Sequence, residues 1–411
     1  MRVLILSQYY DPEPVPKAGE LARELRDRGH DVEVITGFPN YPAGDLYEGY
    51  RLALVQRATL DGIPVRRAYE YPYHGTSAIK RLINYWSFVF SAPLASLFVR
   101  RADVMYVWHP PLTVGVAAWL ISRLRGIPFV YDVQDIWPES AVLSGMLRPG
   151  LVVRLMSRLE RFVYARAAHI LVVTPGAREN LIGKGVAPEK VSAMHHWIDE
   201  SLFEGGSAAD GAAVRAARGW GEQFVALFAG NLGLVQGLDT VVRAAALLRP
   251  EDRIRIALMG DGADRARLQA LARELGVGED RLQFVERQPM SAVPPFLAAA
   301  DALLVHLRRS ELSRWVIPTK TLAYLAAGKP VLMAMEGAAA DLVSEAGAGV
   351  VIPSDDPAQL VDALRNLAAL SPAERDAYGQ AGRSFLRKNM TRQIVVPQYE
   401  EVLRRAARKS A

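Results

Sequence analysis

The segment WVIPTKTLAYLAAGKPVLM, residues 315–333, predicts a loop, a short helix and a buried strand in that order. Pro318 stops the preceding chain, and Thr319 has the side chain of a helix N-cap. Gly328 ends the helix, and the run from Val331 is a buried strand. The apolar face of the helix consists of Leu322, Leu325 and Ala326.

Lys320 lies in the first turn of this predicted helix, where the helix dipole disfavours a cation by about 0.3–1 kcal/mol. A bound anion reverses that penalty, because helix N-termini bind phosphates. The segment therefore predicts a phosphate-binding corner made by Lys320 and the backbone after Pro318. The alternative is a solvated lysine on an ordinary helix.

The composition predicts a two-domain protein with anionic partners. The 411 residues, of which 50% are hydrophobic, fit two domains of about 200 residues each. The absence of cysteine excludes disulfides, thiol catalysis and cysteine-ligated metals. The apolar run at residues 2–6 is too short for a secretory signal, so we expect a cytoplasmic protein. A net charge of +5 favours phosphates or a lipid surface and does not indicate nucleic acid.

Residues 82–99, LINYWSFVFSAPLASLFV, carry no charge and are flanked by Lys80, Arg81, Arg100 and Arg101. Three structures are compatible with this pattern: a buried core helix, a helix in a membrane interface, and a spanning helix at the lower limit of length. Polar residues and a proline within the segment weigh against a span. The basic flanks fit a helix whose ends reach lipid headgroups.

The N-terminal segment predicts a βαβ unit, with strands at residues 3–7 and 32–36 and a helix at 18–28. The loop QYYDPEPVPK after the first strand lacks the glycine-rich dinucleotide fingerprint, which argues against an NAD site. Loops after parallel strands lie at the carboxyl edge of the sheet, where α/β proteins bind ligands. The loops here either line an acceptor cleft or merely connect elements. The side chains expected to contact an acceptor are Tyr9, Tyr10, Lys17, Tyr41 and His109.

The strand predicted at residues 128–132 runs into DVQDIWPE, residues 132–139. Carboxylates at the carboxyl end of a strand lie where substrates bind, so Asp135 is a candidate for contacting a sugar or acceptor hydroxyl, and Glu139 is a further acceptor contact. In the alternative, Asp135 caps the next helix and Glu139 is solvated. No histidine stands at ligand spacing, so we expect no metal site.

A glycine- and alanine-rich stretch after residue 204 marks the expected domain boundary. Beyond it, a strand at 224–229 leads into GNLGLVQG, and a strand at 254–259 leads into GDG. Glycines between a strand and a helix let backbone N–H groups approach an anion closely. Further strands are expected at 282–285, 302–306, 331–334 and 349–352. The fold class is therefore α/β, with two doubly wound units facing a cleft, as suits a nucleotide sugar.

On these residues the chain resembles the family-4 retaining glycosyltransferases of the GT-B fold over essentially its whole length. More narrowly, it is similar to bacterial N-acetyl-L-fucosamine transferases of surface-polysaccharide biosynthesis, which assemble O-antigen or capsule. The motifs that carry the resemblance are FPNYP (38–42), DIWPE (135–139), GNLG (230–233) with QG (236–237), GDG (260–262) and PTK (318–320) before LAAGKP (325–330).

The resemblance implies an acceptor-binding domain at residues 1–204, a nucleotide-sugar-binding domain at 205–385 and a helix at 386–411 that crosses back to the first domain. It assigns Asp135 and Lys320 to the reaction. Helix N-termini and a lysine stabilise a leaving diphosphate without a metal, so we expect no cofactor besides the UDP-sugar co-substrate. The donor-binding residues that it implies are Gly230, Asn231, Gly233, Gln236, Gly260, Arg287, Pro318, Thr319 and Lys320.

Some positions depart from the family pattern. Many members carry an arginine and a lysine where this chain has Asn231 and Gln236, and two glutamates where it has Trp315 and Ala323. Ala323 removes a pair of hydrogen bonds to the ribose, of about 1–3 kcal/mol. The donor-binding candidates to replace them, on the next helix, are Asp341 and Glu345. The histidine usual in the first domain corresponds to Asp135.

We therefore expect a retaining, metal-independent transferase that moves an N-acetylated hexosamine or deoxyhexosamine from a UDP-sugar to a polyprenyl-diphosphate-linked saccharide. The alternatives are a GT-B epimerase acting on UDP-N-acetylhexosamine and a non-catalytic scaffold that binds nucleotide sugar. A basic tail favours peripheral docking at the anionic inner face of the plasma membrane, and so do Arg154, Arg158, Arg161 and Arg166. The sequence predicts no particular oligomeric state.

Overall fold

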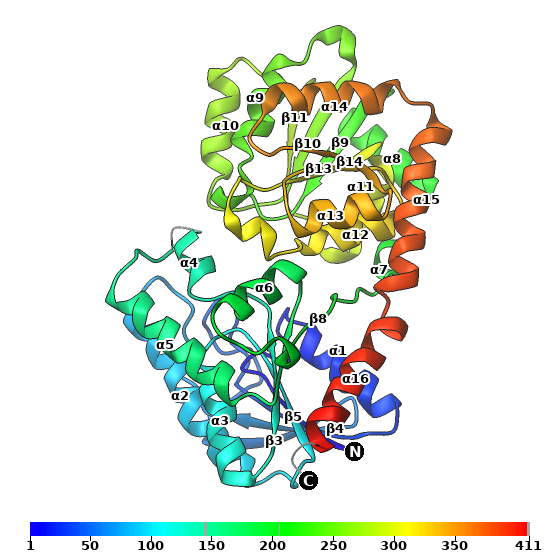
Figure 1. The fold of residues 1–411 in the computed structure, drawn as a ribbon. Helices are drawn as coiled ribbons and strands as arrows, with labels where there is room; N and C mark the ends of the chain where they lie inside the picture. The colour runs from blue at the N-terminus through cyan, green and yellow to red at the C-terminus, as the bar shows by residue number, and fades with distance from the viewer. Residues whose placement is uncertain (144–145, 205, 409–411) are drawn as a thin grey trace. The chain divides into compact units, whose positions relative to one another are not determined.

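The computed structural model describes residues 1–143, 146–204 and 206–408, which form two α/β units (Figure 1). The first unit comprises Met1–His195 and resumes at Val395, and the second comprises His196–Ile394. The chain thus leaves the first unit before the boundary expected at 204/205, and residue 205 lies outside the described residues.

The first unit is built on an eight-stranded sheet with the order β3-β4-β2-β1-β5-β6-β7-β8. Its strands are β1 (Arg2–Leu6), β2 (Asp31–Thr36), β3 (Val55–Leu60), β4 (Ile63–Ala68), β5 (Val104–Trp108), β6 (Phe129–Val133), β7 (His169–Val172) and β8 (Val191–Ala193). Neighbouring strands are parallel except for β3 and β4. Strand β5 is buried throughout and almost wholly apolar, because parallel sheets are covered on both faces.

The antiparallel pair β3–β4 was not anticipated from the sequence. Its two-residue turn consists of Asp61 at φ 49° and Gly62 at φ 76°. Two consecutive positive φ angles are typical of the hairpin turns whose twist matches that of the strands, and Asp-Gly is a frequent choice for them. The signal was therefore present in the sequence.

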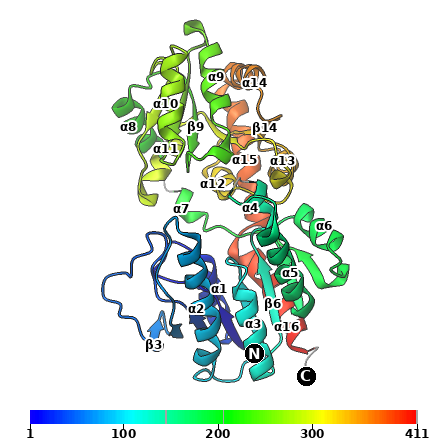
Figure 2. The same ribbon diagram turned by 90° about the vertical axis from the view of Figure 1, so that its left-hand side faces the viewer.

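The helical elements of the first unit surround this sheet. They are α1 (Lys17–Asp27), α2 (Ala78–Ser96), α3 (Val114–Arg125), α4 (Glu139–Leu143), α5 (Leu151–Arg166), α6 (Pro175–Gly183) and η1 (Pro188–Lys190). The connections through α2, α3 and α5 all step along the sheet in the same direction, so right-handed crossovers put these helices on one face. Figure 2 shows α3 between the other two, and α3 packs against both.

The expected closing helix is in fact two helices. Residue Leu386 lies inside α15 (Pro372–Asn389), and the chain breaks before α16 (Arg392–Arg408). Helix α16 packs on the first unit, where Glu400 lies 2.9 Å from Nε2 of His30 and the ring of Tyr399 lies 6.3 Å from that of Tyr106. Residues 409–411 of the expected tail lie outside the described residues.

The uncharged segment at 82–99 forms most of α2, which buries only one of its sides. Phe88, Val89 and Ala92 are buried in the unit, whereas Leu82 and Phe90 are exposed. The alternative of a fully buried core helix is therefore wrong. In the described part of the chain, no helix is both long and apolar enough to cross a membrane.

The second unit contains a six-stranded parallel sheet with the order β11-β10-β9-β12-β13-β14. The strands are β9 (Phe224–Ala229), β10 (Ile254–Met259), β11 (Leu282–Val285), β12 (Ala302–His306), β13 (Val331–Ala334) and β14 (Gly349–Ile352). Two such sheets confirm the fold class expected from the sequence.

Helices flank the second sheet, and α15 completes them. The α-helices before α15 are α7 (Ser201–Glu204), α8 (Ala208–Arg218), α9 (Asp239–Leu247), α10 (Arg265–Glu274), α11 (Val293–Ala299), α12 (Thr319–Ala327), α13 (Ala338–Glu345) and α14 (Pro357–Ala369). The short 3-10 turns are η2 (Leu234–Gln236), η3 (Pro250–Asp252), η4 (Met290–Ala292) and η5 (Glu311–Arg314).

Candidate functional site

Helix α12 begins where the sequence placed the phosphate-binding corner. Pro318 is its N-cap and Thr319 its first helical residue, so the expected capping by Thr319 is wrong by one position. No side chain caps the first turn, and the N–H of Thr321 donates to the carbonyl oxygen of Pro318 at 2.8 Å, which leaves the N–H groups of Thr319 and Lys320 for an anion. Gly328 ends the helix at φ 66°, as expected.

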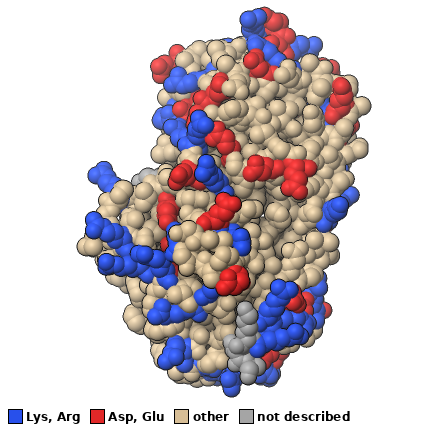
Figure 3. Space-filling model, viewed as in Figure 1, with Lys and Arg blue, Asp and Glu red and all other residues tan. Residues whose placement is uncertain are grey.

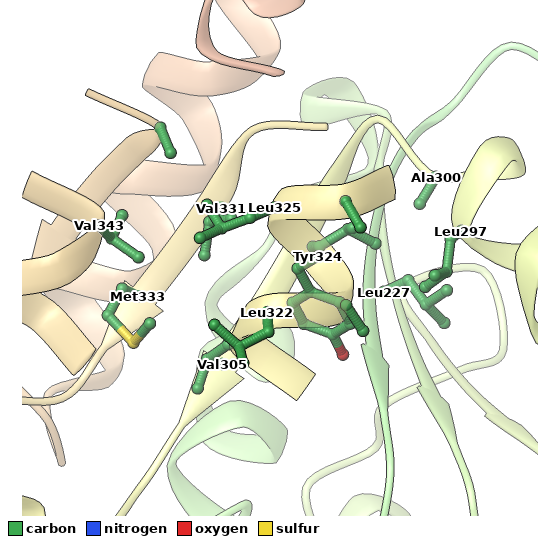
Figure 4. Close-up of a cluster of buried hydrophobic side chains, with 14 of the residues drawn as sticks. Leu227, Leu297, Ala300, Val305, Leu322, Tyr324, Leu325, Val331, Met333 and Val343 are labelled. Atoms are coloured by element: carbon green, nitrogen blue, oxygen red, sulfur yellow. The ribbon is translucent and has the colours of Figure 1, made fainter. Parts of the chain in front are cut away.

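The packing of α12 sets its position against the sheet. Figure 4 shows Leu322, Tyr324 and Leu325 among the buried side chains of the unit, close to Val305 and Met333. The hydroxyl of Tyr324 accepts a hydrogen bond of 2.8 Å from the backbone N–H of Ala229, the last residue of β9. The helix is thereby anchored next to the glycine turn that follows β9.

The glycine turns after β9 and β10 touch each other at the carboxyl edge of the sheet. Gly230 and Gly260 have φ angles of 148° and 147°, which L side chains rarely adopt. A Cβ atom on Gly260 would overlap the carbonyl oxygen of Gly230, and one on Gly230 would lie 2.9 Å from Nζ of Lys320. Glycine at both positions therefore lets the two turns and the lysine lie together.

The half-buried ammonium group of Lys320 has only neutral neighbours. It donates a hydrogen bond of 3.1 Å to Oε1 of Gln236 and lies 3.5 Å from the ring centroid of Phe228. Among the described residues, it forms no ion pair. Burial lowers the pKa of Lys320 to about 7. A lysine beside glycine turns and without a carboxylate partner is suited to an anionic ligand.

The loop between β9 and α9 holds the other predicted residues of the glycine turn. Gly233 precedes η2, the exposed Asn231 borders it, and Gln236 closes η2. The N–H of Leu232 donates a 2.8 Å hydrogen bond to the carbonyl oxygen of Asp261, which ties this loop to the turn after β10. The structure thus brings Gly230, Gly260, Gln236 and Lys320 together.

His306, at the end of β12, was missed by the sequence analysis and supports the same loop. Its Nδ1 lies 2.6 Å from the carbonyl oxygen of Gln236, and the N–H of Asp355 donates to its Nε2 at 3.4 Å. Since Nε2 accepts, Nδ1 carries the proton, and burial lowers the pKa of this histidine and favours the neutral ring. A polar residue at the carboxyl end of a buried strand was the available signal.

Three predicted donor residues lie at the surface of the second unit. Arg287 is exposed just after β11, and Asp341 is exposed in the first turn of α13. Glu345 is the last residue of α13, so it lies close to the start of the next strand, β14. The first residue of β14, Gly349, pairs with Val331, the first residue of β13, at the amino edge of the sheet. Glu345 therefore lies toward the amino edge, and the structure does not bring it to the glycine turns.

In the first unit, two predicted acceptor residues form an aromatic cluster. The ring of Tyr9 lies 5.1 Å from Tyr41 and 5.7 Å from His74, and Tyr41 and His74 are 5.2 Å apart. Tyr10, by contrast, is 1% exposed and belongs to the core. Lys17, the first residue of α1, pairs with Glu20 at 3.7 Å.

A buried carboxylate, Glu13, fixes the loops after β1 and β2. It accepts hydrogen bonds from the backbone N–H groups of Tyr10, Asn40 and Tyr41 at 3.0, 2.9 and 2.8 Å. Burial raises the pKa of Glu13 even so. Glu13, in the loop after β1, therefore fixes the backbone of the FPNYP motif.

A second buried carboxylate, Glu70, extends this network. It accepts 2.7 Å hydrogen bonds from the side-chain amides of Gln8 and Asn40, and burial raises its pKa well above the ordinary value. The buried guanidinium of Arg67 donates to the carbonyl oxygens of Gly37 at 2.9 Å and Asp11 at 2.6 Å. None of these ionisable residues was singled out from the sequence.

The edge of β6 holds a buried acid that the sequence analysis did not select. Asp132 accepts hydrogen bonds from the hydroxyl of Tyr106 and, at 2.7 Å, from the side-chain amide of Gln134, and burial raises its pKa to about 7. The predicted Asp135 lies three positions on and is half-buried, which raises its pKa as well.

The other two predicted residues near β6 are engaged by the protein. Oε1 of Glu139 forms a 2.8 Å ion pair with Lys184, so the alternative of a merely solvated glutamate is wrong. The ring of His109 is 1% exposed, stands edge-on to Tyr131 at 5.8 Å, and has its pKa lowered by burial to about 3. In the described part of the chain, no group of three or more His, Cys, Asp or Glu is placed to hold a metal ion.

The comparisons with known proteins cover both units. Residues 14–197 match the family model described as "Glycosyl transferase 4-like domain", and residues 213–385 match "Glycosyl transferases group 1". The chain is a GT-B glycosyltransferase. The resemblance drawn from the sequence is thereby confirmed at the level of fold and enzyme class.

Relatives and solved structures agree with this assignment. The glycosyltransferase is 28% identical over 414 residues to the putative colanic acid biosynthesis glycosyl transferase WcaI of Escherichia coli K12, covering 96% of this chain and 99% of the relative. It is 28% identical to the probable glycosyltransferase WbjE of Pseudomonas aeruginosa, covering 77% and 78%. The crystal structure of Anabaena Alr3699/HepE in complex with UDP superposes with a TM-score of 0.71 at 17% identity, covering 98% and 99%.

The glycosyltransferase departs from its family at two positions in or before α12. Ala323, where the resemblance leads one to expect a glutamate, is buried in the hydrophobic core of the second unit. Trp315, at the other glutamate position, follows η5 directly. Any contact with a ribose must therefore come from other residues.

Proposed function

We propose that this glycosyltransferase grips the diphosphate of a UDP-sugar with Lys320, the glycine turns after β9 and β10, and the first N–H groups of α12. The observation that carries the proposal is the position of the Lys320 ammonium, which lies beside Gly230 and has no acidic partner among the described residues. A diphosphate there supplies the missing counter-charge. The solved complex of HepE with UDP, which has the same fold, supports uracil as the base.

The same groups account for a transfer that needs no metal. As the glycosidic bond breaks, negative charge gathers on the leaving phosphate, and preorganised N–H groups and a cation stabilise it. The acceptor hydroxyl attacks on the face of the sugar that the leaving group departs from, and the leaving phosphate takes its proton, so the configuration is retained. No protein nucleophile is needed, and Asp135 contacts the acceptor hydroxyl. The UDP-sugar is a co-substrate, and the reaction uses no further cofactor.

The substrates follow from the resemblance and from a relative. The name of WcaI refers to colanic acid biosynthesis, which supports a role in a surface polysaccharide such as O-antigen or capsule. The donor sugar is an N-acetylated hexosamine or deoxyhexosamine, as in the N-acetyl-L-fucosamine transferases. The acceptor is a polyprenyl-diphosphate-linked saccharide reached from the inner face of the plasma membrane.

One observation favours a second candidate. The buried Ala323 removes the glutamate that meets the ribose in many relatives, which fits a scaffold that binds nucleotide sugar without transferring it. This candidate predicts UDP binding with neither transfer nor hydrolysis for any donor. An epimerase instead predicts turnover of UDP-N-acetylhexosamine without an acceptor.

A thermal-shift panel of UDP, GDP, ADP and dTDP sugars tests the proposal, because a ligand that binds the folded state raises the apparent stability by mass action. We expect the largest shift with UDP-N-acetyl sugars and its loss in the Lys320→Ala variant. A shift with GDP or ADP sugars alone would overturn the assignment of the base. Transfer to a short polyprenyl-diphosphate saccharide, followed by NMR of the anomeric configuration, then tests retention and separates the enzyme from the scaffold.

A further inference from the structure

Helix α2 exposes a continuous apolar stripe along its whole length. Ile79 and Phe90 are 72% and 66% exposed. The complete stripe consists of Ile79, Leu82, Ile83, Trp86, Phe90 and Leu94. The spacing of three or four residues puts all of these on one side of the helix. Contiguous exposed apolar surface of this kind marks an interaction site in a folded protein.

The stripe is not needed to hold the helix in place. The opposite side of α2 packs on the unit through Phe88, Val89 and Ala92. Asn84, also on that side, accepts a 2.9 Å hydrogen bond from Gln8 and donates one of 2.7 Å to the carbonyl oxygen of Tyr71. Polar side chains on the outer face would leave these contacts intact, so the apolar stripe calls for another explanation.

A second group of exposed apolar side chains lies on α5, which is beyond α3 on the same face of the sheet (Figure 2). The first turns of α5 expose Leu151, at 69%, together with Val152 and Leu155. We call the stripe of α2 together with these three residues the α2–α5 face. Both helices follow strands, so both begin at the carboxyl edge of the sheet, where Asp135 lies.

The exposed charges of α2 and α5 themselves are basic, and one bordering cation, Arg100, pairs with Asp31 at 3.5 Å. Exposed cations border it at both ends of α2 and along α5, and they include Lys80, Arg100, Arg101, Arg148, Arg154, Arg158 and Arg161. Helix α2 contains no Asp or Glu, and the one carboxylate of α5, Glu160, is buried against Lys184. Figure 3 shows blue side chains gathered on the side of the molecule where Figure 1 has α5.

We propose that the α2–α5 face docks on an anionic lipid surface, with the apolar side chains among the acyl chains and the cations at the headgroups. Apolar area and basic charge add in such binding. A second copy of the chain fits less well, since a two-fold interface would bring the same cations face to face. In this orientation the carboxyl edge of the first sheet lies at the lipid surface. The inference goes beyond the proposed reaction, because lipid binding is measured without any sugar transfer.

Vesicle flotation tests the proposal with the full-length protein. We expect binding to vesicles of phosphatidylcholine with about 30% phosphatidylglycerol, and much weaker binding to phosphatidylcholine alone. The double variant Arg154→Glu with Arg158→Glu should lower the partition coefficient by about 30-fold or more, and Ile79→Ser with Phe90→Ser by about tenfold. The matched controls are Arg243→Glu and Leu247→Ser, an exposed pair on α9 of the second unit, which should bind as the wild type does.

Other outcomes would overturn the proposal. The protein could bind neither kind of vesicle, or both double variants could bind vesicles as strongly as the wild type does. A third such outcome is a dimer, seen in sedimentation, that the Ile79/Phe90 double variant dissociates, together with no binding to vesicles. Urea unfolding of each variant shows that the first unit, which carries the substitutions, is folded. UDP binding, followed calorimetrically, reports on the second unit. A protein that binds UDP but no vesicles would contradict only the docking proposal. A protein that binds vesicles but no UDP would contradict only the proposed donor site.

Discussion

The ammonium group of Lys320 on α12 donates a 3.1 Å hydrogen bond to the side-chain oxygen of Gln236 in the loop after β9. Many relatives carry a lysine where this chain has Gln236, according to the resemblance, so here the partner of Lys320 is a neutral amide. The amide gives the half-buried lysine a neutral partner in the absence of ligand. Three predictions concern this corner and its glycine turns, and a fourth concerns a buried acid of the first unit.

Replacing Lys320 should cripple donor binding. We expect Lys320→Ala to lower kcat/KM by about 10²–10³-fold, since it removes a cation that stabilises charge in the transition state. Steady-state kinetics and UDP calorimetry measure the effect. Lys388→Ala, at an exposed position in the last turn of α15, is the control and should be silent. A Lys320→Ala protein with wild-type affinity for UDP would contradict the proposed site.

Donor binding should depend on pH through the same lysine. Burial lowers the pKa of Lys320 to about 7, so above that pH the free protein has largely lost this proton. A bound diphosphate favours the charged form, and the proton must then be taken up on binding. Affinity for UDP should therefore fall as the pH rises above about 7. Calorimetry at pH 8 in buffers of different ionisation enthalpy should show proton uptake, and Lys320→Ala should abolish it.

A methyl group at Gly260 should disrupt the contact between the two glycine turns. It would collide with the carbonyl of Gly230 at a φ of 147°, so Gly260→Ala should cost more than about 3 kcal/mol of stability. Gly276→Ala is the matched control, since that glycine also has a positive φ, 65°, but meets no atom within 4 Å. Its cost should be about 1–2 kcal/mol. Urea unfolding separates the two, and equal losses would refute the role given to the close approach.

Asp132 should make the stability of the protein depend on pH. Burial raises its pKa to about 7 from an ordinary value of 3.8, so between these two pH values the folded state binds more protons than the unfolded state. Stability should therefore fall as the pH rises from about 4 to about 7, by up to about 1.4 kcal/mol per pH unit, and then level off. Asp132→Asn keeps the shape and should remove the contribution of Asp132, while that of Glu160, whose pKa burial also raises to about 7, remains. Urea midpoints from pH 5 to 8 test this, and parallel curves for the two proteins would contradict it.

The strands of the second unit were predictable because each is a short, mainly apolar run, interrupted only by single polar residues such as Arg255 in β10 and Gln283 in β11. The bounds expected for β9 and β10 agree with the structure for this reason. The corner at Lys320 was predictable because its parts are local: a proline, a helix start and a glycine stop within one segment. Gly230 and Gly260 were predictable as turn residues because each directly follows a predicted strand.

Features made by distant residues were not predictable in this way. Arg67 lies in β4 and Glu70 in the loop after it, where charged residues are usually solvated. Only the folded chain brings Arg67 to the carbonyl oxygen of Gly37 and Glu70 to the side chain of Asn40. Tyr10 and His109 come after strands, as ligand-binding residues do, but their side chains turn inward. Periodicity reports which side of an element is apolar, and it carries no information on which loops share a buried carboxylate.

Helix α16 completes the first unit. Tyr399 and Leu403 are buried there, although about 200 residues of the second unit separate them from His195. A ribosome adds roughly 5–20 residues per second, so the surface of the first unit that α16 covers stays exposed for some tens of seconds while the second unit is synthesised. A fragment ending at His195 would leave the same surface exposed to solvent. The first unit is thus completed only after α16 has been synthesised, and chaperones that shield exposed apolar surface are expected to meet the nascent chain during that interval.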